Sequence, residues 1–328
     1  MYQPPQKNQW SGRTDPLDGE DGNRWHHIVN LIDLSLGSPT RQTAKQNVVV
    51  LGFCCDEGVR RNSGRVGAKK GPSAIRQALS NLAVHFENEE LTLWDAGDVI
   101  CQGQNMEAAQ EMLGLKVCKL LEAGFRPIVL GGGHEVAFGH YLGIDQYAKA
   151  REEKVGIINI DAHFDLRRYD KQGSSGTPFL QISGLLNDRE HFHYLPIGIS
   201  ELSNTKALFK TAEQLGVQYI TDQRFNESSF NKIIEEIDGF INQCDSVYLT
   251  IDMDAFNAGE SPGVSAPSPN GIDKNKTIQL LKCIITSGKV ISMDIAEVNP
   301  ELDLDNRTAK LAAYFVGTIV KEMSKLNP

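Results

Sequence analysis

Three short runs of acidic residues and histidines in this chain carry side chains that bind divalent metal ions. Asp161, His163 and Asp165 alternate in the run DAHFD, directly after an apolar, β-branched segment over 155–160. Because side chains alternate across a strand, the same period continued past its end would aim all three to one side. The spacing predicts a metal site at the end of a buried strand.

Two further strand-like segments end in residues of the same type. The segment 247–251 is followed by Asp252 and Asp254, and the segment 127–130 is followed by three glycines and His134. Each acidic pair alone also fits a strand-end turn or a solvated loop, but three such ends argue against coincidence. The predicted metal ligands are His134, Asp161, His163, Asp165, Asp252 and Asp254.

Four carboxylates and two imidazoles are more protein ligands than one catalytic ion normally takes. The set therefore predicts two ions with bridging carboxylates. In two-metal hydrolases the two ions lie roughly 3.5–4 Å apart and activate a water molecule. Oxygen-rich, thiol-free ligands disfavour structural zinc and favour Mn²⁺, although Zn²⁺, Fe²⁺ and Co²⁺ also suit them. We expect two Mn²⁺ ions per chain.

The order of the predicted elements shows what must position these ligands. After a polar segment over 1–43, apolar strand patterns alternate with helix patterns, which predicts a single catalytic domain over 44–328. Strands that are apolar on both faces are typical of a parallel sheet covered by helices, and in such sheets ligands bind beyond the carboxyl ends of strands. The predicted strands cover 47–53, 91–94, 127–130, 155–160, 193–199, 218–221, 247–251 and 290–294.

Length and charge favour one enzyme domain that acts on a small molecule. The chain has 328 residues, 40% of them hydrophobic, which can fill one large α/β core. Its 33 basic and 42 acidic residues give a net charge of −9, which argues against nucleic acid or an anionic membrane as the partner.

The six cysteines lack C-x-x-C spacing, and no signal peptide or membrane span is evident, so we expect reduced thiols and a cytoplasmic protein.

Other catalytic motifs find no support in the sequence. An HExxH zinc motif would need a histidine where Phe138 stands, and neither a P-loop nor a GxSxG nucleophile turn occurs. Two loops rich in Gly, Pro and Ser, 172–178 and 257–271, adjoin the predicted site, and we interpret both as substrate-facing.

With these residues identified, the sequence resembles a known enzyme superfamily. The runs GGGH (131–134), DAHFD (161–165), DMD (252–254) and DIAEVNP (294–300) resemble those of the ureohydrolases, the arginase and agmatinase superfamily. The resemblance extends from about residue 48 to the C-terminus. It implies an α/β fold, a three-layer α/β/α sandwich around an eight-stranded, mainly parallel sheet, with a binuclear Mn²⁺ centre.

Within this superfamily the chain is most similar to the formimidoylglutamases. The similarity rests on the runs WSGRTD (10–15), DEGVRRNSGRVGA (56–68), DAHFDLR (161–167) and SSGTP (174–178). Arginases carry a histidine in the loop where this chain has SSG. The resemblance implies hydrolysis of the amidine N-formimidoyl-L-glutamate to L-glutamate and formamide in histidine degradation, and a homo-oligomer.

The resemblance also implies a role for each metal ligand. One ion would be bound by His134 and Asp165, the other by His163 and Asp254, with Asp161 and Asp252 bridging. Asp165 would in addition be catalytic, because it is placed to hold the nucleophilic water and to pass its proton to the leaving amine.

Four further residues would contact the substrate. Glu297 resembles the catalytic acid that binds the guanidinium or amidine group in these enzymes, with a surface carboxylate as the alternative. The two substrate carboxylates suit arginine side chains, and Arg167, Arg65 and Arg168 are the candidates. Arg167 is preferred because it follows Asp165 by two residues and occupies a substrate-contacting position in relatives, whereas Arg65 and Arg168 fit ordinary surface positions equally well.

Two alternatives stay open. Another amidine or guanidine hydrolase, such as an agmatinase or a guanidinobutyrase, would share the metal centre, but an arginine-lined pocket would repel an amine. A non-catalytic metabolite-binding homologue would be expected to have lost metal ligands, and all six are present.

Overall fold

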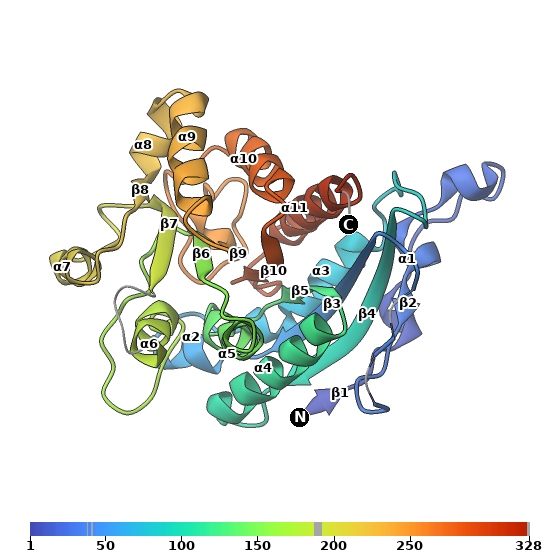
Figure 1. Cartoon of the computed structure of the whole chain (residues 1–328), viewed down its shortest axis with the longest axis horizontal. Helices are drawn as coiled ribbons and strands as arrows, with labels where there is room; N and C mark the ends of the chain where they lie inside the picture. The colour runs from blue at the N-terminus through green and yellow to red at the C-terminus, as the bar shows by residue number, and fades with distance from the viewer. Residues whose placement is uncertain (38, 41, 187–191, 327–328) are drawn as a thin grey trace.

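A mostly parallel sheet of ten strands runs through the molecule (Figure 1). The computed structural model describes residues 1–37, 39–40, 42–186 and 192–326. The strands are β1 (Tyr2–Gln3), β2 (Asn30–Leu31), β3 (Gln46–Cys54), β4 (Leu91–Ile100), β5 (Arg126–Leu130), β6 (Val155–Ile160), β7 (His193–Ile199), β8 (Ile220–Thr221), β9 (Ser246–Asp252) and β10 (Val290–Ala296). Their order is β1-β4-β3-β5-β10-β9-β6-β7-β8, with β2 also paired to β4.

All eight predicted strands are present, and the sheet gains two short ones that the sequence analysis did not predict. β1 and β2 have two residues each and both pair with β4, β1 being antiparallel. A period of two cannot be recognised in two residues. β4 is also six residues longer than predicted, because Asp95 and Asp98 interrupt its apolar pattern but are paired in the interior with Arg76.

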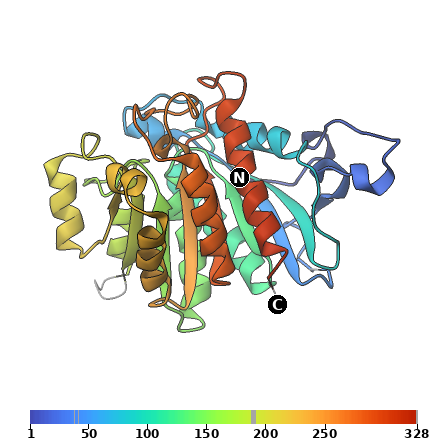
Figure 2. The same ribbon diagram turned by 90° about the horizontal axis from the view of Figure 1, so that it is seen from above.

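Helices cover both faces of the sheet, which confirms the three-layer α/β/α sandwich (Figures 1 and 2). One face carries α3 (Gly71–Leu79), α8 (Asp222–Glu227), α9 (Phe230–Ile241), α10 (Lys274–Thr286) and α11 (Arg307–Met323). The other carries α4 (Met106–Glu122), α5 (Val136–Lys149), α6 (Pro178–Leu185) and α7 (Lys206–Gln214). The short helices α1 (Trp25–Ile28) and α2 (Glu57–Arg61) lie in the connecting segments.

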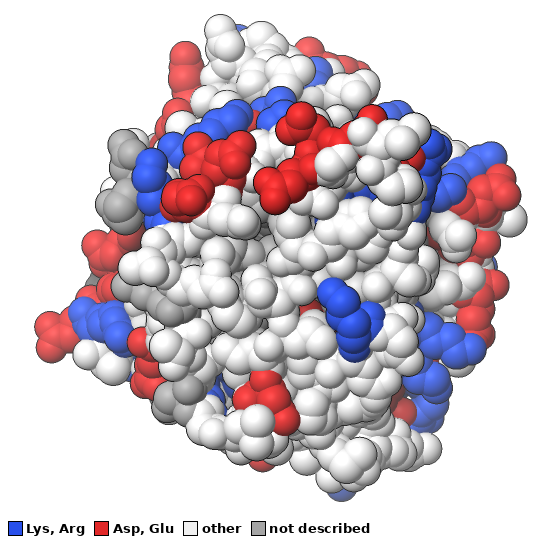
Figure 3. All heavy atoms as spheres, turned by 90° about the vertical axis from the view of Figure 1, so that its right-hand side faces the viewer, with Lys and Arg blue, Asp and Glu red and all other residues white. Residues whose placement is uncertain are grey.

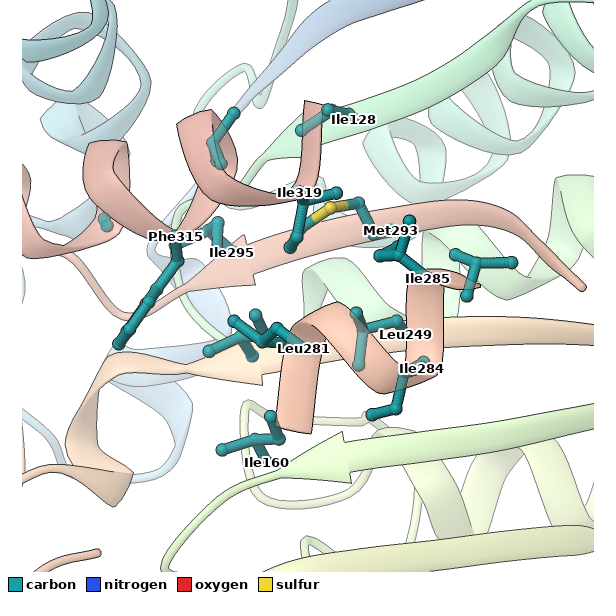
Figure 4. Close-up of a cluster of buried hydrophobic side chains, with 14 of the residues drawn as sticks. Ile128, Ile160, Leu249, Leu281, Ile284, Ile285, Met293, Ile295, Phe315 and Ile319 are labelled. Carbon is teal, nitrogen blue, oxygen red and sulfur yellow. The ribbon is translucent and has the colours of Figure 1, made fainter. Parts of the chain in front are cut away.

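Alternation along the strands divides the core into two layers. In β3, Val48 and Val50 face one layer and Val49 and Leu51 face the other. Figure 4 shows the first layer, where side chains of α10 and α11 lie against β5, β9 and β10. Each fully buried aliphatic side chain of this kind contributes roughly 1.5–3 kcal/mol, so these layers fix the positions of the strand ends.

The N-terminal segment is attached to this sheet although its composition is polar. Trp10 and Trp25 are buried, and the Trp10 indole donates a 2.6 Å hydrogen bond to Asp95.

Figure 3 shows the side of the molecule at the right of Figure 1, where charges of both signs surround a largely uncharged centre. The domain limit at residue 43 stays a prediction. No described helix is long and apolar enough to cross a membrane.

Candidate metal centre

Four neighbouring strands in the middle of the sheet supply the candidate site. β5, β10, β9 and β6 are adjacent in that order, and their carboxyl ends lead to His134, Glu297, Asp252 and Asp161. Parallel pairing places these ends at one edge of the sheet, although the residues are up to 163 positions apart in the chain. This is the position that the sequence predicted for a ligand site.

A glycine turn positions His134. Gly131 donates a 2.7 Å hydrogen bond to Ile295 in β10, and Gly133 donates one of 3.0 Å to Cys55, just past β3. A Cβ atom on Gly132 would lie 1.7 Å from the Cys55 carbonyl oxygen. The three consecutive glycines therefore let the turn pass close to two neighbouring strand ends. This turn places His134 inside the site, just before α5 begins.

His134 lies among three carboxylates. Its Nδ1 atom is 3.1 Å from Asp161, 3.0 Å from Asp165 and 3.0 Å from Asp252. Its Nε2 atom lies 3.0 Å from the Thr250 hydroxyl, which fixes the plane of the ring. The Nδ1 atom is thus the one that faces the metal-binding oxygens.

His163 completes a second group of ligands. Its Nδ1 atom lies 3.2 Å from Asp254 and 3.5 Å from Asp161, whose two oxygens therefore face different histidines. Asp252 likewise contacts His134 with one oxygen and accepts a 2.7 Å hydrogen bond from the Asp254 backbone with the other. All six predicted ligands are brought together, and Asp161 lies between the two histidines, where a bridging ligand would lie, whereas Asp252 contacts only His134 of the two.

The pKa values of these groups report how crowded the carboxylates are. Burial and repulsion by Asp161 raise the pKa of Asp165 to about 6. Burial and the charge of Asp252 raise the pKa of Asp254 well above its usual value. Burial would lower the pKa of His134, but the three surrounding carboxylates outweigh it and raise that pKa well above normal.

The site has the donors that a pair of divalent cations needs. Two groups of mutually close ligand atoms share Asp161. Among the described side chains, that of Asp254, a predicted ligand, has its Oδ1 atom buried without a hydrogen-bond partner. Buried oxygens of this kind are costly unless a cation compensates them, so the residues present fit a binuclear metal centre.

Two acidic residues of the site have unusual backbone conformations. Asp165 has φ of +48° and Glu297 has φ of +65°, values that non-glycine residues rarely adopt. Glu297 is held there by two hydrogen bonds, from its backbone N–H to Gly132 (2.8 Å) and to its carboxylate from the His134 backbone (2.9 Å). Strain of this kind gathers at functional sites, which agrees with the predicted roles.

A cavity of about 400 Å³ opens above the ligands. It is lined by Asn62, Ser63, Gly64, Arg65, His134, His163, Asp165, Arg167, Ser175, Asp252, Asp254, Ser265, Ala266 and Glu297. Both loops interpreted as substrate-facing contribute, through Ser175 and through Ser265 and Ala266.

The three candidate arginines lie in different surroundings. Arg167 lines the cavity, and its backbone donates a 2.9 Å hydrogen bond to Gly176 of the opposite loop. Arg65 also lines the cavity, but two of its guanidinium nitrogens are bonded to the carbonyls of Val264 (2.8 Å) and Ser265 (3.0 Å). Arg168 is exposed and lies outside the described lining.

Two further groups of polar residues escaped the sequence analysis. Asn62, within the run 56–68, and Ser265, within the loop 257–271, line the cavity, and neither residue was singled out from the sequence. Beneath the ligands, the Thr250 hydroxyl donates a 2.6 Å hydrogen bond to Asp294, which also lies 2.7 Å from the buried His140. Asp294 carries the only signal that could have been used, an acid at a strand end.

The chain belongs to the arginase family. The family model matches residues 46–321, which include all six ligands and Glu297. The fold and the glycine turn agree with this assignment. The clustered donor atoms agree with the metal dependence of the family.

Relatives named formimidoylglutamase match this chain over nearly its whole length. The formimidoylglutamase of Geobacillus thermodenitrificans is 43% identical over 328 residues, covering 100% of this chain and 99% of its own. That of Aeromonas salmonicida is 45% identical, covering 95% and 96%.

Solved structures of the same name share the fold. The formimidoylglutamase of Bacillus subtilis superposes with a TM-score of 0.81 over 93% of both chains at 22% identity. A variant of Trypanosoma cruzi formiminoglutamase with Mn²⁺ gives a TM-score of 0.76 at 26% identity, covering 90% of this chain and 98% of its own.

Proposed function

We propose that this chain hydrolyses N-formimidoyl-L-glutamate to L-glutamate and formamide with the help of two Mn²⁺ ions. The observation that carries the proposal is one cavity with Glu297 and five of the six clustered metal ligands at its floor, the sixth, Asp161, being buried, and with Arg65 and Arg167 in its walls. Full-length relatives named formimidoylglutamase at 43% and 45% identity support the choice of substrate.

The ligands would hold the ions, and the remaining steps rest on side chains of this chain. When bound, the two ions lower the pKa of a shared water molecule and so supply the nucleophile. Asp165 would hold that water beside the formimidoyl carbon. As the new C–O bond forms and the C–N bond to glutamate breaks, Asp165 would pass a proton to the departing nitrogen, which leaves formamide and the glutamate amine.

The two ends of the substrate would be recognised by opposite charges. Glu297 has one buried oxygen without a partner, which suits a hydrogen bond from the amidinium group. Among the described residues, none forms a hydrogen bond or an ion pair with the Arg167 guanidinium. Its N–H donors are therefore available for a carboxylate. Arg65 has two nitrogens engaged with carbonyls and would offer fewer donors to the substrate.

Agmatine is the best alternative substrate to test, because it has a guanidinium at one end and an amine at the other. Two arginines in the cavity walls would repel that amine. We therefore expect formimidoylglutamate to be favoured over agmatine, arginine and guanidinobutyrate.

The decisive experiment is a comparison of substrates on protein loaded with Mn²⁺. Formamide and glutamate released from formimidoylglutamate are measured beside urea released from the three guanidine compounds, with chelator-treated protein as the control. Metal-dependent turnover of formimidoylglutamate alone is expected. Preference for agmatine would reject formimidoylglutamate as the substrate. Two bound ions without turnover of any of the four compounds would favour a metabolite-binding homologue.

The proposal includes a homo-oligomer in the cytoplasm. All six cysteines are free thiols, which suits a reducing compartment. Sedimentation of the purified protein would test the oligomer, and a single-chain mass would reject it.

A further inference from the structure

Asn299 is a buried asparagine that joins three separate segments around the cavity. It follows Glu297 by two residues and is fully buried, yet it lies outside the described lining. Its side-chain amide donates hydrogen bonds to the carbonyls of Arg65 (3.1 Å) and Val66 (3.0 Å). Its backbone N–H donates to Gly263 (2.7 Å), and its side-chain oxygen accepts from the Glu301 backbone (3.0 Å).

Each segment that Asn299 joins contributes to the cavity. The segment 62–66 supplies Arg65, the segment 263–266 supplies Ser265, and the segment that contains Asn299 supplies Glu297. The first two are also bonded to each other, since the Arg65 backbone donates to the Ser265 hydroxyl at 2.8 Å. Asn299 is therefore a direct hydrogen-bonded link between the segment of the acidic floor and the arginine wall.

Gly67 leaves room for this arrangement. It has φ of +134°, and a Cβ atom there would lie 2.2 Å from the Asn299 side-chain oxygen. Its N–H donates to Asp56 (2.8 Å), which keeps the backbone pressed against the asparagine. The close approach thus depends on a glycine in a conformation that other residues rarely adopt.

We propose that Asn299 is a positioning residue that sets the distance between the Arg65 wall and Glu297, and thereby the fit of the substrate between its two charged ends. The inference rests on the proposed function, in which the cavity wall that contains Arg65 lies at the carboxylate end of the substrate. Because Asn299 touches neither a metal ligand nor the cavity, its loss affects substrate binding rather than the chemical step.

The test replaces Asn299 and compares it with a matched asparagine. Asn257, which is only partly buried, makes the same pattern of side-chain bonds within the loop that contains Gly263, donating to Pro269 (2.8 Å) and Asn270 (3.1 Å) and accepting from Gly259 (2.8 Å). It lies outside the described lining of the cavity. Asn299→Ala is expected to raise KM about tenfold, because the Arg65 wall loses two hydrogen bonds that hold it in place, with kcat within about threefold and two ions retained. Asn257→Ala is expected to leave KM unchanged.

Two further measurements separate positioning from general stability. In a double-mutant cycle, Asn299→Ala added to Arg65→Ala should raise KM little beyond Arg65→Ala alone, because both act on one wall. Hydrogen exchange of the segment 62–67 should be faster in Asn299→Ala than in Asn257→Ala. Asn299→Ser serves in place of the alanine variant if the latter does not fold.

The outcomes distinguish this inference from the proposed function. A raised KM with faster exchange at 62–67 supports it. An unchanged KM in a folded, two-metal variant, or unchanged exchange at 62–67, overturns it. The exchange measurement needs no substrate, so absence of turnover in the unaltered protein would reject the proposed function alone.

Discussion

The acids and histidines of the candidate metal centre were the residues easiest to single out from the sequence, because metal-binding chemistry depends on residue type and spacing. D-x-H-x-D after a buried strand predicted three ligands on one side, and the structure does bring them to His134 and Asp254. It does so through a bend at 162–163 and the positive φ of Asp165, because β6 ends at Ile160 and the period of two does not continue. Backbone strain at Asp165 and Glu297 could not be predicted. At Glu297 the conformation is held by hydrogen bonds with Gly132 and His134, which lie far away in the sequence.

Arg167 and Arg168 are a matched pair that tests substrate recognition. They are adjacent and both exposed, but only Arg167 lines the cavity. A charge-assisted hydrogen bond contributes about 1.5–3 kcal/mol, so Arg167→Ala should raise KM for formimidoylglutamate roughly tenfold to hundredfold with its metal retained. Arg168→Ala should leave KM unchanged. Steady-state kinetics with metal analysis check this, and equal effects would remove Arg167 from the site.

At the scale of elements, the sequence predicts where the strands lie in the chain better than it predicts their order in the sheet. Eight apolar segments were assigned correctly, but no local pattern shows that β5, β10, β9 and β6 are adjacent. That order depends on packing between helices and strands distant in the chain. Likewise, Asp95 and Asp98 made β4 seem to end early, because their buried partner Arg76 lies in another element.

The glycine turn after β5 offers a test of how elements position the site. A Cβ atom at Gly132 would overlap the Cys55 carbonyl, whereas nothing lies within 4 Å of the same position at the exposed Gly239 of α9. Gly132→Ala should therefore lower stability by about 1–3 kcal/mol, as overpacking does, and weaken Mn²⁺ binding by moving His134. Gly239→Ala should stabilise the helix by up to about 1 kcal/mol. Thermal unfolding and metal titration measure both, and a Gly132→Ala protein with normal metal affinity would contradict the positioning argument.

At the scale of the whole molecule, the metal centre is an electrostatic problem that the fold alone does not solve. Four carboxylates are gathered at the middle of the sheet in a chain whose net charge is already −9. The raised pKa values of Asp165 and Asp254 are direct consequences of burial and mutual repulsion. Bound cations would relieve that repulsion in the folded state only, since the unfolded chain does not hold the ligands together.

Removal of metal should therefore destabilise the entire domain and not merely inactivate it. An ion present at a hundredfold excess over its dissociation constant stabilises the folded state by about 2.7 kcal/mol, and two such ions would raise the melting temperature by roughly 10 °C. Calorimetry before chelation, after chelation and after return of Mn²⁺ measures the change, with chelator already saturated by Mn²⁺ as the control. An identical melting temperature with and without metal would mean that the carboxylates are compensated within the protein, and the two-ion interpretation would then fail at its physical basis.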